Sequence, residues 1–531
     1  MRRIICLLFL CMTGSASFAQ IEGRSGGILK PEQGLMDIRH YTVQLTIDPG
    51  NKRIAGTTVI KLVTKEPVRQ LVFDLSDSLP TTKAVIDGKS APFTHSGNLL
   101  KITVPQQLPA GVHEASIHYG GKPIVAKRPP WKGGFTWDTD SSGNPFIAVT
   151  CQLEGGKIYY PCKDHPSDEP NEGADLIITV AKGLVVAGPG LLVNRTTKGK
   201  QTTFHWQTKY TINNYSIVFN VGKFQVVERK YRTVDGHTVP LQFYVLEQHK
   251  SKAEHHLDIF ERTIQMQEKY FGEYPWVKEK IAICETPHLG MEHQTMNAYG
   301  NKFKYTQVGG QDFDGLMHHE FGHEWWGNKI TANDWADMWI QEGICTYGDA
   351  LYIRDYEGEP AHQKRMREIA MHTANIRPIV QGKDLATDSV YISDIYGKGA
   401  LFMHTLRYII GDSIFFPALK AFATDPKYTY DNKVTTKDVQ DHFSKASGKV
   451  LKPLFDLFIY STNKLDIRVK QVSPNQYSLT LQNIKMELPV EVVTDGQEQL
   501  MELNGNSQIV TSQTAPIVDP DGWYLKRIIL E

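Results

Sequence analysis

Three residues near the middle of the chain have the types and the spacing of a metal site: His319, His323 and Glu342. The two histidines are four positions apart, so on a helix their side chains lie on one face, with Cβ atoms about 5–6 Å apart. Two imidazole nitrogens can then bind one metal ion at about 2.0–2.1 Å, and catalytic zinc usually has three protein ligands and one open position. Glu342 follows His323 after eighteen intervening residues, enough for a second helix to return with the third ligand.

Glu320 directly follows His319, so on the same helix its carboxylate projects beside a metal ion and not onto it. A carboxylate in that position can act as the base for a metal-bound water. Gly327 and Asn328 predict the C-terminal end of this helix. A His-Glu-x-x-His pentapeptide also occurs on ordinary surface helices, so the motif alone leaves a purely structural role for both histidines open.

The segment from His319 to Gly343 also contains Trp-Trp-Gly-Asn, then Trp-x-Asp-x-Trp and finally Glu-Gly. With these motifs it resembles the zinc aminopeptidases of peptidase family M1, gluzincins that include aminopeptidase N and the leukotriene epoxide hydrolase. The resemblance implies one Zn²⁺ per chain, bound by His319, His323 and Glu342. It also implies that Glu320 is the catalytic base.

A first segment in the N-terminal half matches a motif with which the family binds the free amine of its substrate. Gln152 and Glu154 match a Gln-x-Glu motif that precedes an aromatic-Pro-Cys-x-Asp-x-Pro turn, here Tyr160 to Pro166. The resemblance implies that Glu154 reaches into the active site and binds the amine. Without the resemblance, Glu154 would be interpreted as a carboxylate on a surface loop.

A second segment, Gly290, Met291 and Glu292, matches the family's Gly-x-Met-Glu-Asn motif. The match implies a backbone edge that pairs with the peptide, and a carboxylate, Glu292, for the N-terminal ammonium. Leu289 and His293 stand where the family has its first glycine and its asparagine, which leaves the backbone pairing and the first subsite open. We expect His293 to be a hydrogen-bonded histidine without a catalytic role.

Tyr396 begins a Tyr-x-Lys-Gly tetrapeptide that precedes an apolar helix predicted over Ala400–Ile410. The resemblance implies that this tyrosine donates a hydrogen bond to the tetrahedral intermediate, and Tyr391 corresponds to a second tyrosine of the family. A phenol suits the role because it donates a hydrogen bond without titrating at neutral pH.

The charges of the chain balance, with 58 Lys and Arg residues against 58 Asp and Glu residues and a pI near 7.3. A neutral chain without charge runs gives no indication of binding to nucleic acid or to an anionic membrane. No apolar run after the N-terminus is long enough for a membrane span.

The first nineteen residues are expected to be a signal peptide. Arg2 and Arg3 precede an apolar stretch, Ile4–Met12, and a small-x-small cleavage site ends at Ala19. We therefore expect a mature chain from about Gln20, exported to the periplasm or secreted.

Residues 20–235 contain strand after strand with period-two alternation, for example 41–47 and 174–180. Residues 236–460 are mainly helical in pattern, and residues 465–531 again predict short strands. The expected fold class is multidomain α+β. By resemblance, it has an N-terminal β-saddle domain, a thermolysin-like α/β catalytic domain and a small C-terminal β-sandwich.

Larger family members add a C-terminal helical domain that covers the active site. This chain ends with predicted strands, so we expect a short form with an open cleft; a homodimer in which a partner covers the cleft stays possible. Of the cysteines beyond the signal peptide, Cys151 and Cys162 could form a disulfide or remain buried thiols.

Together these features predict a zinc-dependent aminopeptidase that hydrolyses the first bond of peptides with a free N-terminus. The alternatives are a non-catalytic peptide-binding protein on the same scaffold, an epoxide hydrolase, and a thermolysin-like endopeptidase. The amine-binding glutamates argue against an endopeptidase. The complete set of metal and base residues argues against a non-catalytic protein.

Overall fold

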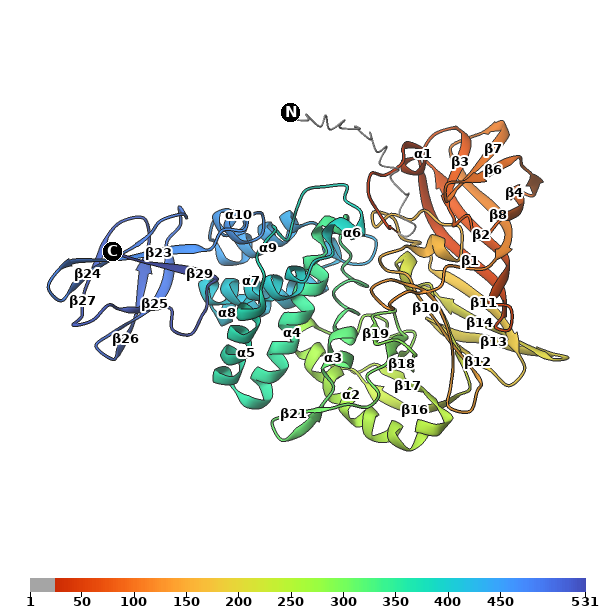
Figure 1. Cartoon of the computed structure of the whole chain (residues 1–531). Helices are drawn as coiled ribbons and strands as arrows, with labels where there is room; N and C mark the ends of the chain where they lie inside the picture. The colour runs from red at the N-terminus through yellow and green to blue at the C-terminus, as the bar shows by residue number, and fades with distance from the viewer. Residues whose placement is uncertain (1–23) are drawn as a thin grey trace, which may run out of the picture.

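The computed structural model describes residues 24–531, so the expected signal peptide lies outside the described residues. Figure 1 shows a β-rich N-terminal part, a helical middle part and a small β-rich C-terminal part in chain order. This arrangement confirms the predicted multidomain α+β fold. In the described part of the chain, no helix is both long and apolar enough to cross a membrane.

The N-terminal part is built around one large twisted sheet. Its strands are β1 Met36–Asp48, β2 Arg53–Thr64, β4 Thr81–Ile86, β5 Lys89–Ser90, β8 Gly111–Gly121, β11 Ala174–Ala181, β13 Leu191–Lys198 and β14 Gln201–Thr208. They lie in the order β13-β14-β11-β1-β2-β8-β4-β5. Buried and more exposed residues alternate along β11, because successive side chains of a strand point to opposite faces. The strands predicted over 41–47 and 174–180 are confirmed.

Two smaller sheets complete this part. One contains β9 Gly134–Thr139, β10 Pro145–Thr150, β12 Val185–Ala187 and β15 Asn220–Gly222, and the other contains β3 Val68–Asp74, β6 Phe93–Ser96 and β7 Leu99–Leu108; a short helix, α1 Pro31–Gly34, precedes β1. The chain between β8 and β9, and the chain that follows β10, both reach the middle part, where they take part in the site described below.

The middle part begins with a five-stranded sheet. Its strands are β16 Phe224–Arg232, β17 Thr238–Leu246, β18 Ile281–Glu285, β19 Gly290–Met291 and β20 Asn297–Tyr299. The order is β16-β17-β18-β20-β19, which leaves β19 at one edge. Strand β16 pairs with β17 along its whole length. It therefore belongs to this sheet, although it precedes residue 236, where the helical middle part was predicted to begin.

Helices fill the rest of the middle part and flank a small hairpin. They are α2 Lys250–Phe271, α3 Gly315–Gly322, α4 Trp339–Glu357, α5 Glu359–His372, α6 Thr387–Val390, α7 Asp394–Ile410, α8 Asp412–Thr424, α9 Thr436–Ser447 and α10 Lys452–Phe458; the hairpin is β21 Thr306–Val308 with β22 Gln311–Phe313. The α3 helix begins at the Asp314 side chain, which accepts a hydrogen bond from the Met317 N–H at 3.1 Å. It ends at Gly322, so the predicted end at Gly327 and Asn328 is wrong.

The C-terminal part contains two small sheets. Their strands are β23 Leu465–Ser473, β24 Gln476–Leu481, β25 Leu488–Thr494, β26 Gln497–Leu503, β27 Gln508–Thr511, β28 Ile517–Val518 and β29 Lys526–Leu530. Trp523 attaches this part to α7, since its ring stacks on His404 and Tyr408 at centroid distances of 4.4 and 4.5 Å. The Thr405 hydroxyl donates a hydrogen bond to the Trp523 carbonyl at 2.6 Å.

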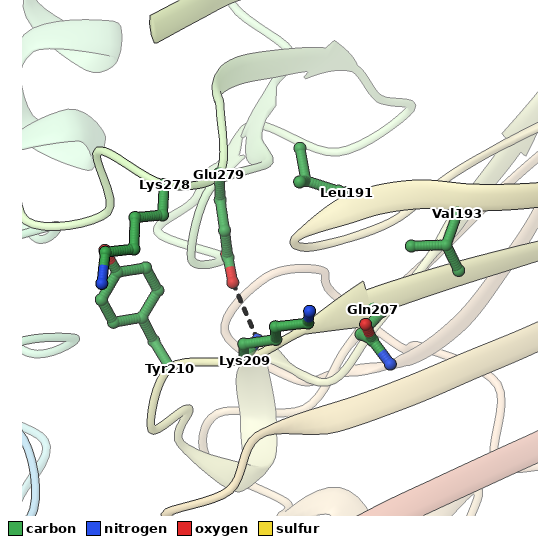
Figure 2. A pocket seen from close by; sticks show the side chains of 7 residues that line it. All are labelled: Leu191, Val193, Gln207, Lys209, Tyr210, Lys278 and Glu279. Carbon is green, nitrogen blue, oxygen red and sulfur yellow. Dashed lines mark hydrogen bonds between the residues drawn. The ribbon is translucent and has the colours of Figure 1, made fainter. Parts of the chain in front are cut away.

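Polar contacts also join the N-terminal part to the middle part. A pocket of about 380 Å³ lies at this junction. Glu279, one of its lining residues (Figure 2), accepts a hydrogen bond from the Lys209 backbone N–H at 2.9 Å. Next to it the buried Lys280 ammonium donates to the Gly188 carbonyl at 2.9 Å. None of the residues that line this pocket lines the cavity described below.

The cysteines of the described part are buried and free, so the structure has no Cys151–Cys162 disulfide. Burial raises the pKa of both thiols. They therefore pack as small apolar side chains in the core.

Candidate metal centre and active site

Two packed helices bring the three predicted metal ligands together. His319 and His323 lie at the end of α3, and Glu342 lies in the first turn of α4. The Nε2 atoms of the two histidines are 3.5 and 3.3 Å from the same oxygen, Glu342 Oε2. One ligand atom from each residue lies within 4.8 Å of the others, a separation suited to binding a single ion.

The other ring nitrogen of each histidine is held by a hydrogen-bond acceptor. His323 Nδ1 donates to the Trp326 carbonyl at 2.8 Å, and His319 Nδ1 lies 3.0 Å from Asp349 Oδ2. Acceptors at Nδ1 favour the tautomer with a free Nε2, which is the form that binds a metal ion. Asp349 was not predicted, although it follows Glu342 by seven positions on α4 and therefore shares its helix face.

This donor set fits zinc. Two imidazoles and one carboxylate leave a fourth position open, as in hydrolytic zinc sites. Glu342 Oε2 is buried and has no hydrogen-bond donor within the described residues, as expected for an oxygen that binds a cation. Burial opposes ionisation of Glu342, yet the neighbouring His323 and His319 lower its pKa to about 2.

Glu320 lies beside the metal ligands and faces edge strand β19. A Cβ atom at Gly290 would lie 2.6 Å from Glu320 Oε1, so the carboxylate rests directly against the glycine backbone. Burial raises the pKa of Glu320 to about 8, and the nearby histidines act in the opposite direction. A bound cation would further favour the carboxylate form.

A cavity of about 610 Å³ contains the metal centre. The predicted residues Gln152, Gly290, Met291, Glu292 and Tyr391 line it together with Tyr396 and Glu320. The hydroxyl groups of Tyr391 and Tyr396 are 2.6 Å apart, and the Tyr396 ring centroid is 5.9 Å from that of His319. Helix α7 begins at Asp394, six residues before the predicted start, so Tyr396 lies in its first turn.

The structure separates the two glutamates predicted to bind an amine. Glu292 lines the cavity, and the Gln152 side-chain amide donates to its Oε1 at 2.5 Å. Glu154 does not line the cavity; its Oε1 accepts a hydrogen bond from the Gly133 N–H at 2.7 Å. Burial raises the pKa of Glu154 to about 7, and its Oε2 has no partner among the described residues.

Several residues of the cavity wall were not predicted. They are Arg128, Pro130, Trp131, Leu289, Leu316 and Ser393. Leu289, which replaces a family glycine, is 40% exposed. His293 does not line the cavity, and neither ring nitrogen has a hydrogen-bond partner in the described part of the chain, so the expectation of a hydrogen-bonded histidine is wrong. Burial lowers its pKa to about 3, which keeps the ring neutral.

Comparison with known proteins gives a consistent result. The family described as the peptidase family M1 domain matches residues 255–458, which include the metal ligands, Glu292, Glu320 and Tyr396. Tricorn protease-interacting factor F2 from Thermoplasma acidophilum is 22% identical over 398 residues, 68% of this chain and 48% of that protein. Aminopeptidase N from Caulobacter vibrioides is 25% identical over 266 residues, 47% of this chain and 30% of that protein. The chain thus spans half or less of the length of these relatives.

Among solved structures, a mutant M1 zinc metallopeptidase from Deinococcus radiodurans bound to a Tyr-Ser-Ala substrate has a similar fold. The TM-score is 0.67 at 20% sequence identity, with 83% of this chain and 96% of that chain covered. The fold, the match to the family domain and the metal centre within it agree: residues 255–458 form a peptidase family M1 domain that contains a three-ligand site of the kind that binds zinc.

Proposed function

We propose that this protein is a zinc-dependent aminopeptidase that removes N-terminal residues from peptides. The observation that supports it is the meeting, in one cavity, of a three-ligand metal site, an adjacent carboxylate and a buried second carboxylate, Glu292. His319, His323 and Glu342 would hold the zinc ion. When bound, zinc polarises the scissile carbonyl and activates water.

Glu320 moves the proton in this proposal. It accepts a proton from the attacking water and passes it to the leaving amine. Burial raises the pKa of Glu320, and a cation bound at the adjacent ligands would oppose that shift and keep the carboxylate form that accepts a proton. Its contact with Gly290 holds the carboxylate in place between the metal ligands and edge strand β19.

Tyr396 supplies a neutral hydrogen-bond donor for the oxyanion that forms on the carbonyl. Burial and the carboxylate of Glu342 raise its pKa well above the ordinary tyrosine value, so the hydroxyl stays protonated at neutral pH. Tyr391 lies within hydrogen-bonding distance of the Tyr396 hydroxyl and orients it. A donor held in place before the reaction needs no rearrangement as negative charge develops.

Glu292 binds the substrate's free amine in this proposal and so selects exopeptidase cleavage. Its carboxylate is 3% exposed, and the hydrogen bond from Gln152 fixes its orientation. A buried carboxylate gains from a cationic partner, and a peptide's N-terminal ammonium is such a partner. Glu154 would support the site from behind through Gly133, without contact to the amine.

The test is hydrolysis of a panel of aminoacyl arylamides by wild-type protein, with and without a zinc chelator. We expect activity that the chelator abolishes and added zinc restores. Glu320→Gln should retain one zinc per chain and lose about 10²–10⁴-fold in kcat. Turnover by a zinc-free protein, or normal turnover by Glu320→Gln, would contradict the mechanism; cleavage of an epoxide alone would indicate the epoxide hydrolase.

We also propose that the protein is exported, because its first nineteen residues have the pattern of a signal peptide. N-terminal sequencing of the mature protein should then begin at about Gln20. A protein that retains Met1 in the cell would contradict export.

A further inference from the structure

A loop of the N-terminal part forms one wall of the catalytic cavity. Arg128, Pro130 and Trp131, between β8 and β9, line the cavity together with the metal ligands. Backbone hydrogen bonds between Arg128 and Lys132 close the loop, at 2.9 and 3.2 Å. Directly after it, the Gly133 N–H donates to Glu154, so the loop is attached to the segment that carries Gln152.

Arg128 is the positively charged residue of this wall. The cavity is lined by the carboxylates of Glu292, Glu320 and Glu342, and Arg128 is its sole arginine or lysine among the described residues. Each of the three carboxylates already has a role: Gln152 donates to Glu292, and the other two lie at the metal centre.

The Arg128 guanidinium has no polar partner among the described residues of the protein. Within residues 24–531 it has no ion pair and no side-chain hydrogen bond; its contact is the ring of Trp131, 5.2 Å from the guanidinium carbon. Such a cation–π contact holds the plane of the guanidinium and leaves its N–H groups free at the edge. A guanidinium has five N–H donors and binds a carboxylate through two parallel hydrogen bonds.

We infer that Arg128 is a specificity-determining residue that binds a carboxylate of the peptide substrate. The inference rests on the proposed peptidase function. A peptide offers this chemistry from two sources, the side chain of an acidic residue or the free C-terminus of a short peptide. With Glu292 taking the ammonium and Arg128 taking the carboxylate, the cavity has complementary charges for the two ends of a zwitterionic substrate.

Two matched substrate pairs test the inference and separate the two sources. The first pair is the glutamyl and the glutaminyl arylamide, which differ in a side-chain carboxylate. The second is a tripeptide acid and its C-terminal amide. We expect the wild type to prefer the charged member of one pair by about tenfold in kcat/KM, the typical effect of a partly exposed charge-assisted hydrogen bond. Added salt should weaken the preference.

Three variants complete the experiment. Arg128→Gln should reduce the preference to about one, and Arg128→Lys should restore only part of it, because lysine cannot make the two parallel hydrogen bonds. Lys132→Gln makes the same charge change in the same loop at a side chain that does not line the cavity, and it should keep the wild-type preference. Alanyl arylamide, which lacks a carboxylate, is the reference substrate to which the rates of each variant are normalised.

The outcomes distinguish this inference from the proposed function. Cleavage of alanyl arylamide without a preference in either pair, or a preference that survives in Arg128→Gln, would overturn the role of Arg128 alone. No cleavage of any substrate would overturn the proposed function. In that case, calorimetric binding of the tripeptide acid and amide to zinc-loaded protein still decides whether Arg128 selects the carboxylate. Equal affinities for the acid and the amide would overturn the role of Arg128.

Discussion

Gly290 lies where any side chain would collide with the proposed catalytic base. On the present backbone, a Cβ atom at this position would be 2.6 Å from Glu320 Oε1 and 2.9 Å from Leu316 Cδ1. Ordinary contact begins at 3.4 Å, so in Gly290→Ala the carboxylate must retreat by roughly 0.8 Å or the edge strand must move outward.

The expected effect follows from the function of that carboxylate. A displacement of about 1 Å from the reactive geometry can cost about 10²-fold in rate, and a general base contributes about 10²–10⁴-fold in total. Gly290→Ala should therefore lower kcat by about 10- to 100-fold. Zinc content should stay at one per chain, because the three atoms nearest to the added Cβ belong to Glu320 and Leu316 and not to a metal ligand. Steady-state kinetics and metal analysis measure both quantities.

A double variant shows whether the loss acts through Glu320. If it does, adding Gly290→Ala to Glu320→Gln produces little further loss of kcat, because residues that act as a unit are not additive. Gly505→Ala is the matched control, since no atom lies within 4 Å of its added Cβ, and it should match the wild type. A wild-type kcat in Gly290→Ala, or fully multiplicative losses in the double variant, would refute the reasoning.

Three further predictions concern the metal, the amine and pH. Asp349→Asn removes the carboxylate that holds His319 and should weaken zinc binding by about 10–100-fold in a chelator competition; an unchanged affinity would contradict its positioning role. Acetylation of a peptide's N-terminus should lower kcat/KM by about 10–100-fold in the wild type, and by much less in Glu292→Gln. Equal rates for free and acetylated peptides would indicate an endopeptidase. Burial opposes ionisation of Glu359, but hydrogen bonds from Arg407 lower its pKa to about 2. Its stabilisation is therefore complete above the unfolded pKa of about 4.3 and is lost as pH falls toward 2. Melting temperatures over this range should fall less steeply in Glu359→Gln, and an identical slope would exclude this contribution.

The parts of the site that depend on one helix could be predicted from the sequence. The spacing of His319 and His323 specifies a shared helix face wherever the helix forms, and the structure places both on the same oxygen of Glu342. The predicted C-terminal end of α3 was wrong by several residues. The chain after Gly322 continues in tight turns that bring Trp326 back to His323, and local preference for glycine does not determine such a turn.

The cavity wall could not be predicted, because it depends on contacts between segments far apart in the chain. The hydrogen bond from Gln152 to Glu292 joins residues 140 positions apart. The loop of Arg128 is joined to the segment after β10 by the hydrogen bond from Gly133 to Glu154. Glu154, which the family resemblance places at the substrate's amine, accepts the hydrogen bond of Gly133 and does not line the cavity. The metal ligands and Glu320 are therefore fixed by the local geometry of α3 and α4. Gln152 and Arg128 come from the N-terminal part, and their position in the cavity depends on how the two parts pack.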